Sequence, residues 1–224
     1  MSRESAELQS RKEIIFVDAE VVAPDEFLND PFGYFEREGK NTRPGDKVRY
    51  VEGIVARNHR AVRDLPDWKL KDTDIPVRVV GKKVNLQRHQ IGETQNPLHE
   101  FEIMTHIQEH HLPCARPLAR IEKDGQHLLV MERLEGERLF VEKEGVADEA
   151  KQNLIRHGFS LQDIDEIVTQ ATMEMAELSL KFEEEGIIRP WHLKDMIVKI
   201  DFEHKKVISV TPVDWERTLI KKKE

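Results

Sequence analysis

Three side chains near the end of the chain, His192, Asp195 and Asp214, belong to types that can support acid–base or metal chemistry. Carboxylate oxygens are ligands that Mg²⁺ and Ca²⁺ prefer, and an imidazole with a pKa of about 6.5 can exchange a proton near neutral pH. Asp195 directly precedes an apolar run at 196–198, and Asp214 follows a β-branched run at 207–211. Since side chains at strand ends lie at the edge of a sheet, we expect these acids to be accessible to a cation.

A long helix precedes these residues and must position them. Ser160, with Asp163 three places further on, suits a helix N-cap, and Gly186 suits the left-handed position that ends a helix. Apolar residues recur between them at alternating steps of three and four, which predicts an amphipathic helix over 161–185. These residues are Leu161, Ile164, Val168, Ala171, Met175, Leu178 and Phe182.

A loop over 186–195 and a β-hairpin over 196–214 follow this helix, and the hairpin ends in Val-Asp-Trp-Glu at 213–216. This order of parts resembles the catalytic centre of the protein-kinase-like superfamily. It is similar above all to the branch of aminoglycoside and choline phosphotransferases and lipopolysaccharide-core kinases. The resemblance implies that Asp214 holds Mg²⁺ across the phosphates of ATP. The alternative is a structural aspartate that caps the following segment.

The loop departs from the family's pattern of His-x-Asp followed by an Asn before a short strand. Arg189, Pro190 and Trp191 stand where His-x-Asp is expected, and Asp195 falls on the Asn position. An indole cannot act as a base. The resemblance therefore leaves His192 and Asp195 as catalytic candidates, with Asp195 also a second metal ligand. The alternative for His192 is a hydrogen-bonded loop residue without a catalytic role.

The resemblance also implies two lobes, with a basic residue of the first lobe that contacts the nucleotide and pairs with a glutamate early in the next helix. Lys82 lies 18 positions before Glu100, which suits such an ion pair, and Glu102 is the second choice of partner. Gly81 and Lys82 could equally form a hairpin turn that leaves the lysine in solvent. The basic residues that qualify are Arg78, Lys82 and Lys83.

Turn and capping signals predict the elements around this pair. Asn96 as N-cap and Pro97 at the first helical position predict a helix over 97–110. An Asp-Gly turn at 124–125, between apolar runs at 118–122 and 127–131, predicts a hairpin.

The segment 131–136, Met-Glu-Arg-Leu-Glu-Gly, resembles the hinge of the phosphotransferase branch, whose backbone amides and carbonyls bind adenine. The resemblance assigns Glu132 and Leu134 to the cofactor. The family's Gly-x-Gly-x-x-Gly loop is absent, and only Gly53 lies near its place. This departure weakens the case for a phosphate cradle built from backbone amides.

The first 74 residues are explained least by the resemblance. The polar segment 1–13 is expected to be flexible, and 14–17 and 21–22 are predicted to pair as strands. The segment 24–44 mixes turn formers with aromatic residues, which indicates an ordered loop or short helices. Further strands are predicted over 47–56, from 61 onward and over 75–80.

Composition limits the class of protein. The chain has 224 residues, of which 35% are charged and 38% apolar, with a net charge of −8. This charge argues against nucleic acid or anionic membranes as the main partner. No apolar run reaches the roughly 18 residues that span a bilayer, and the first residues do not have the layout of a signal peptide. Cys114 is the single cysteine and cannot form an intramolecular disulfide, so we expect a cytoplasmic protein.

These observations predict an α+β, two-lobed kinase-like fold. A flexible 1–13 would precede an N-lobe over 14–134, with an antiparallel sheet and one helix, and a minimal helical C-lobe over 135–224. The expected function is an atypical phosphotransferase that uses ATP and Mg²⁺ on a small molecule or an unknown acceptor. The short chain after Asp214 argues against the helical platform that docks peptides in protein kinases.

Two other functions remain open from the sequence. The first is a catalytically inactive, kinase-like (pseudokinase) protein that serves as a binding or regulatory module. The second is an α+β interaction domain without a site, which predicts that Glu100, Asp195 and Asp214 are dispersed.

Overall fold

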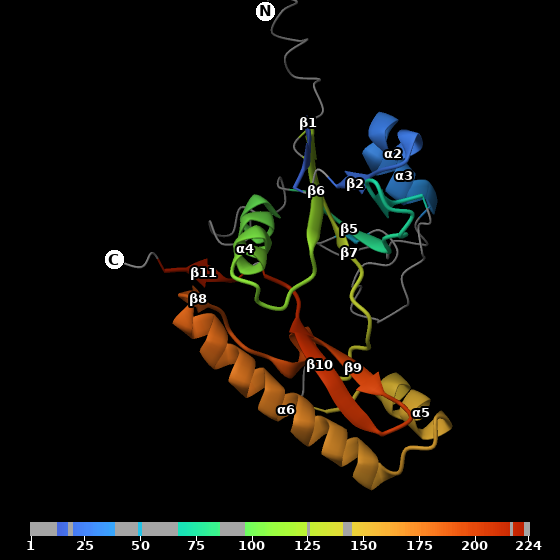
Figure 1. Ribbon diagram of the computed structural model, residues 1–224, viewed down its shortest axis with the longest axis vertical. Helices are drawn as coiled ribbons and strands as arrows, with labels where there is room; N and C mark the ends of the chain where they lie inside the picture. The colour runs from blue at the N-terminus through green and yellow to red at the C-terminus, as the bar shows by residue number, and fades with distance from the viewer. Residues whose placement is uncertain are drawn as a thin grey trace, which may run out of the picture. The chain divides into compact units, whose positions relative to one another are not determined.

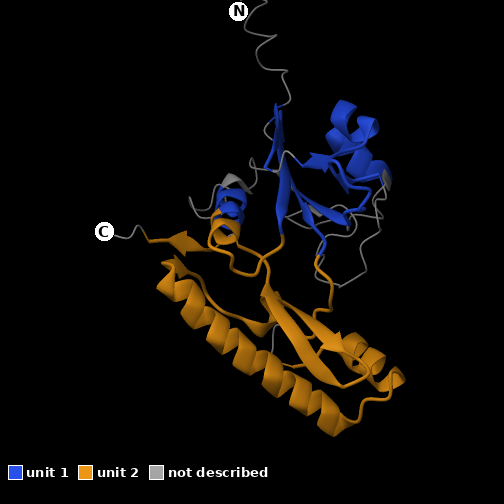
Figure 2. Cartoon of the chain, viewed as in Figure 1, with its two compact units in different colours: residues 1–105, 116–133 blue, residues 106–115, 134–224 orange. Residues whose placement is uncertain are grey.

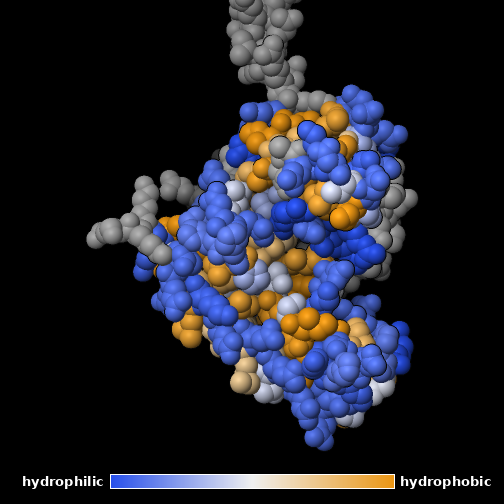
Figure 3. Space-filling view, viewed as in Figure 1, coloured by the Kyte–Doolittle hydropathy of each residue, from blue (hydrophilic) through white to orange (hydrophobic). Residues whose placement is uncertain are grey.

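The computed structural model describes residues 13–17, 20–38, 49–50, 67–85, 97–124, 126–140, 145–215 and 217–221 (Figure 1). The chain forms two compact units (Figure 2). The first comprises Met1–Thr105 and Arg116–Arg133, and the second comprises His106–Ala115 and Leu134–Glu224. The face of the molecule in Figure 3 is mostly hydrophilic, with smaller hydrophobic areas. Within the described ranges, no helix combines the length and the apolar character needed to cross a bilayer.

A five-stranded antiparallel sheet forms the centre of the first unit, in the order β1-β6-β7-β5-β3. The predicted hairpin is confirmed as β6–β7, with Asp124 of its turn in the left-handed region at φ +52° and Gly125 outside the described residues. Together with the helices, this sheet confirms a mixed α+β fold. The strands are β1 (Glu13–Phe16), β6 (Pro117–Lys123), β7 (Gln126–Glu132), β5 (Val79–Asn85) and β3 (Arg49–Tyr50).

The strand pairing predicted for the N-terminal segment was wrong. β1 pairs with β6 and not with the next strand, β2 (Val21–Val22), which pairs with β4 (Lys69–Leu70). Both partners are distant in sequence, so the closeness of β1 and β2 along the chain did not reveal them. Gly53, most of 47–56 and the residues from 61 to 63 lie outside the described residues.

The hairpin turn considered for Gly81 and Lys82 was also wrong. Both residues lie inside β5, where they are in register with Val130 and Leu129 of β7. The glycine serves close packing, because a Cβ at position 81 would lie 2.7 Å from the ring of Phe35. Gly81 therefore does not mark a turn. It marks the place where the strand packs against an aromatic ring.

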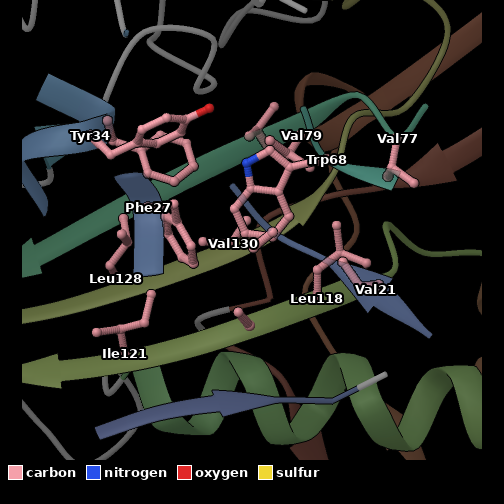
Figure 4. Close-up of a cluster of buried hydrophobic side chains, with 14 of the residues drawn as sticks. Val21, Phe27, Tyr34, Trp68, Val77, Val79, Leu118, Ile121, Leu128 and Val130 are labelled. Carbon is pink, nitrogen blue, oxygen red and sulfur yellow. The ribbon is translucent and has the colours of Figure 1, made fainter. Parts of the chain in front are cut away.

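Two short helices, α2 (Asp25–Asn29) and α3 (Pro31–Glu38), carry Phe35 and other buried aromatic residues. Short helices were one of the two structures that the composition of 24–44 indicated. Phe27 lies at the centre of the cluster, 4.5 Å from Trp68 and 5.8 Å from Tyr34 between ring centroids. The cluster continues into the apolar side chains of the sheet, including Val79, Leu118, Ile121, Leu128 and Val130 (Figure 4).

Helix α4 (Pro97–Glu109) begins at the proline, as predicted, and Asn96 lies outside the described residues. Its buried apolar side chains include Ile103, Met104 and Ile107. Beyond the helix, burial raises the pKa of the Cys114 thiol to about 11, against a smaller opposing effect of a hydrogen bond from Gln108. The single thiol is therefore protonated at neutral pH.

The second unit is built on α6 (Leu161–Glu184), which matches the long predicted helix. The Ser160 side chain accepts from the Asp163 amide while the Asp163 carboxylate accepts from the Ser160 amide, and Gly186 follows the helix at φ +77°. Both predicted ends are confirmed. The other elements are α5 (Asp148–Arg156), β8 (Ile187–Ile188), the 3₁₀ turn η3 (Leu193–Asp195), β9 (Met196–Asp201), β10 (Lys206–Pro212) and β11 (Leu219–Ile220).

The core of this unit forms between α6 and the antiparallel pair β9–β10 (Figure 1). Alternate residues of β9 point inward, so that Met196, Val198 and Ile200 are buried together with Ile164 and Ile167 of α6. The small pair β8–β11 is also antiparallel. The core contacts hold the β9–β10 hairpin on α6, and the open end of this hairpin carries the candidate acids.

Candidate functional site

The β9–β10 hairpin brings Asp195 and Asp214 together. Asp195 is the last residue of η3 and directly precedes β9, whose Met196 is in register with Pro212 at the end of β10. One step further, the Val213 amide donates to the Asp195 carbonyl at 2.8 Å. The two acids therefore flank the open end of one antiparallel pair, one on each side.

Asp214 has a backbone conformation that few side chains adopt. Its φ is +66°, in the left-handed region that asparagine and aspartate tolerate better than most residues. Such a conformation costs about 1 kcal/mol or more, and it persists where the surrounding structure imposes it. The side chain is exposed, so the carboxylate is accessible.

The carboxyl of Asp195 is in an unfavourable electrostatic environment. Its pKa is raised, first by burial and then by the negative charge of Asp214, while Arg189, Lys194 and Arg138 act in the opposite direction. A half-buried carboxyl whose ionisation is opposed by a neighbouring negative charge ionises more readily when a cation binds beside it. The arrangement favours cation binding.

The donor set fits Mg²⁺ in the company of phosphates. Within the described part of the chain, no group of three or more His, Cys, Asp or Glu side chains could hold a metal alone. Mg²⁺ is usually bound through one or two carboxylates, with waters and substrate phosphates as its other ligands. Asp195 and Asp214 supply such a pair of carboxylates.

Arg189 lies between two tryptophan rings beside these acids. Its guanidinium carbon is 4.5 Å from the ring centroid of Trp215 and 5.2 Å from that of Trp191, and Nη2 donates to the Val213 carbonyl at 3.0 Å. Phe182 of α6 stacks on Trp215 at 5.5 Å and meets Trp191 edge-on at 5.3 Å. Trp191, which replaces the expected aspartate, thus has a packing role.

His192 precedes η3 in an extended conformation, and its carbonyl accepts from the Asp195 amide at 2.9 Å. Its side chain is exposed, and in the described part of the chain it forms no hydrogen bond or ion pair. An exposed imidazole can exchange protons with solvent or with a ligand. The catalytic role of His192 stays a prediction.

Lys82 and Glu100 form the ion pair that their spacing suggested. Nζ of Lys82 lies 2.7 Å from Oε2 of Glu100, and the two side chains are only 4% and 3% exposed. Of the other basic candidates, Arg78 is exposed, and the side chain of Lys83 lies outside the described residues. The pair belongs to the first unit, whereas Asp195 and Asp214 belong to the second.

The backbone of segment 131–136 is partly engaged in hydrogen bonds. The Glu132 amide donates to the Arg116 carbonyl and the Arg133 amide donates to the Arg78 carbonyl, both at 2.8 Å. The Glu132 carboxylate also pairs with Nε of Arg116 at 3.3 Å. The amide of Leu134 forms no backbone hydrogen bond with a described residue, so it is the candidate donor of this segment.

Position 136, the last of this segment, is occupied by glycine for a steric reason. Its φ is +127°, and a Cβ there would lie 2.6 Å from the Val198 carbonyl oxygen. The next residue, Glu137, forms two backbone hydrogen bonds with Val198 of β9 at 2.9 and 3.0 Å. The close approach of the segment to β9 therefore requires glycine.

Sequence reasoning missed Arg138, Arg189 and Lys194 as neighbours of the acids. The presence of Trp191 two residues after Arg189 was a usable signal, because a guanidinium often stacks on an indole. The contribution of Arg138 has no local signal, since it depends on how the segment after Gly136 meets β9.

No protein-family profile and no curated protein matches the chain. Among solved structures, the bifunctional kinase-methyltransferase WbdD is similar with a TM-score of 0.41 and 12% identity, over 79% of this chain. The chain spans 31% of the length of that protein. At this level the similarity assigns neither a fold family nor an activity.

Proposed function

We propose that this protein is a kinase-like phosphotransferase that binds ATP with Mg²⁺ and acts on a small molecule or another acceptor. The observation that carries the proposal is the pair of carboxylates at the end of the β9–β10 hairpin, Asp195 and Asp214. They repel each other, and Asp214 occupies a strained backbone position. Two acids held together at a cost in stability are typical of a binding site rather than of a structural element.

In this proposal Asp195 and Asp214 are the metal ligands. Bound Mg²⁺ would neutralise charge on the phosphates and keep them in line for transfer. Lys82 would contact the phosphates, and Glu100 would hold the ammonium group in place. The carbonyl of Glu132 and the amide of Leu134 would bind the adenine edge.

His192 is the proposed proton acceptor for the attacking hydroxyl group, with Asp195 as the other candidate. The exposed imidazole suits this task, whereas a carboxylate that binds a metal is a weaker base. Phosphoryl transfer would then leave ADP and a phosphorylated acceptor.

A second candidate function is a catalytically inactive, nucleotide-binding module. The observation that favours it is the packing of Trp191 against Phe182 at the position where the family carries an aspartate. A packed indole cannot orient a hydroxyl group through a carboxylate. In this alternative the acids bind the metal and nucleotide without turnover.

Thermal-shift measurements with adenylyl imidodiphosphate and Mg²⁺ test binding. At a ligand concentration about 100 times its Kd, a bound ligand adds about 2.7 kcal/mol to the free energy of unfolding. The wild type should show a shift that requires Mg²⁺. Asp214→Asn should lose it, because asparagine keeps the left-handed preference but removes the charge. Asp165→Asn, at an exposed position of α6, is the matched control and should keep it.

Accumulation of ADP from ATP then separates the two functions. A phosphotransferase turns over ATP, slowly even without its acceptor, and Asp214→Asn abolishes turnover. Binding without turnover identifies the inactive module. Full activity of Asp214→Asn would exclude the proposed metal site.

A further inference from the structure

Arg189 is an unusual residue to find in the interior of the second unit. Its exposed fraction is 6%, although it carries a full charge. Burial of a guanidinium is costly unless hydrogen bonds and aromatic faces replace its water. Here Trp191 and Trp215 supply the faces, and the Val213 carbonyl accepts from Nη2.

This hydrogen bond acts on the peptide group that leads into Asp214. The Val213 carbonyl and the Asp214 amide belong to one planar unit, and φ of Asp214 is the rotation about the bond that follows it. On its other side, Val213 is fixed by the bond from its amide to the Asp195 carbonyl. Both peptide groups of Val213 are therefore held, one by Asp195 and one by Arg189.

We propose that Arg189 is a positioning residue that sets the direction of the Asp214 carboxylate toward a bound metal ion. The inference rests on the proposed function, because it needs Asp214 to be a metal ligand. The stacked guanidinium holds the Val213–Asp214 peptide plane, and this plane keeps Asp214 at φ +66°. Arg189 itself touches neither metal nor phosphate in this role.

The shape of the guanidinium distinguishes this role from a simple charge effect. A planar group can lie against two indole rings and still donate in its own plane, whereas an ammonium group cannot stack in this way. If Arg189 acted only through its charge near Asp195, lysine would replace it. The positioning role predicts that lysine fails.

The experiment measures Mn²⁺ binding, by electron paramagnetic resonance of the free ion, in the presence of adenylyl imidodiphosphate. Arg189→Lys should weaken Mn²⁺ binding by about 10- to 100-fold, as is found when a residue that orients a metal ligand is removed. Nucleotide binding without metal should not change. Arg156→Lys, the same substitution at an exposed position of α5, should bind Mn²⁺ as the wild type does.

A double variant tests whether Arg189 acts through Asp214. Mn²⁺ is titrated to concentrations at which the residual affinity of Asp214→Asn, through Asp195, is measured. In that background the effect of Arg189→Lys should disappear, because the Asp214 carboxylate that it positions is no longer there. A general loss of structure would instead add to the effect of Asp214→Asn. Full additivity would overturn the proposal, as would unchanged Mn²⁺ binding by Arg189→Lys.

The outcomes also separate this inference from the proposed function. Failure of the wild type to bind Mn²⁺ with the nucleotide analogue excludes both. Binding by the wild type and equally by Arg189→Lys excludes only the role of Arg189. If Arg189→Lys does not fold, as judged by circular dichroism, Trp191→Leu replaces it. Trp191→Leu removes one face of the stack and should also weaken Mn²⁺ binding. Unchanged Mn²⁺ binding by this variant would reject the positioning role of Arg189.

Discussion

The two units hold their ionisable candidates in opposite ways. In the first unit, Lys82 and Glu100 carry opposite charges, are buried and lie 2.7 Å apart. In the second unit, Asp195 and Asp214 carry the same charge, and the charge of Asp214 adds to burial in raising the pKa of Asp195. Loss of one partner from the first pair would leave a buried charge uncompensated, whereas loss of Asp214 from the second pair would relieve a charge that opposes ionisation of Asp195. A pair of the second kind is expected where a cation binds.

The two regions also differ in backbone conformation: the first pair lies in regular secondary structure, whereas unusual φ values occur near the second pair. Lys82 and Glu100 lie inside a regular strand and a regular helix. Asp214 and Gly136 have φ of +66° and +127°, and neither lies in a strand or helix. Asp214 thus depends on a special backbone conformation, which local packing must enforce.

The largest expected effect tests the stabilising pair. Glu100→Ala removes the carboxylate next to a buried ammonium group, and the free energy of unfolding should fall by about 3–5 kcal/mol in urea denaturation. Glu102→Ala, at an exposed position of the same helix, is the control and should change little. Equal effects of the two variants would remove the distinction between the two pairs.

The next effect tests the backbone difference. Gly136→Ala places a methyl group 2.6 Å from the Val198 carbonyl oxygen at φ +127°, so the free energy of unfolding should fall by about 1–3 kcal/mol. At Gly145 an added Cβ meets no atom within 4 Å. Gly145→Ala should therefore be nearly neutral in the same denaturation experiment. A neutral Gly136→Ala would show that the approach to β9 is not tight in solution.

A smaller effect of opposite sign is expected for the second pair. Without metal, Asp214→Asn removes the repulsion on Asp195, and we expect the free energy of unfolding to rise by about 0.5 kcal/mol, as for partly screened charges. Asp165→Asn serves again as the control. Destabilisation by Asp214→Asn in chemical denaturation would mean that this carboxylate supports the fold, as Glu100 does.

The pH dependence of stability gives the finest test. The folded-state pKa of Asp195 lies above its ordinary value of 3.8, mainly through burial and then through Asp214. The folded state therefore binds more protons than the unfolded state, and Asp195 costs stability increasingly as pH rises from 3.8 through the folded pKa. Asp195→Asn should gain stability relative to the wild type over that window, in denaturation curves at several pH values. The gain should shrink in the Asp214→Asn background.

Features determined by local patterns were predictable from the sequence. The apolar spacing of α6, its cap at Ser160 and the glycine at 186 fixed that helix within a residue at each end. The Asp-Gly turn predicted the β6–β7 hairpin, and Pro97 marked the start of α4. Each of these signals acts between residues close in sequence, and the tertiary contacts of these segments agree with it.

Features determined by contacts between distant segments were not predictable. Gly81 suggested a turn because glycine favours turns, but the ring of Phe35, far away in sequence, determines its role. The burial of Lys82 follows from the same continuation of β5. Likewise, no local pattern showed that Arg189 would reach the Val213 carbonyl. The special φ of Asp214 depends on that tertiary contact.

The shielded thiol of Cys114 has a practical consequence for studies of this protein in solution. Because its pKa is about 11 and the residue is only 8% exposed, it will react slowly with maleimides and methanethiosulfonates at neutral pH. The wild-type chain is therefore a nearly silent background for site-directed labelling. Cysteines introduced at exposed positions such as Met173 on α6 and Glu102 on α4 would carry spin labels without first removing the native sulfur.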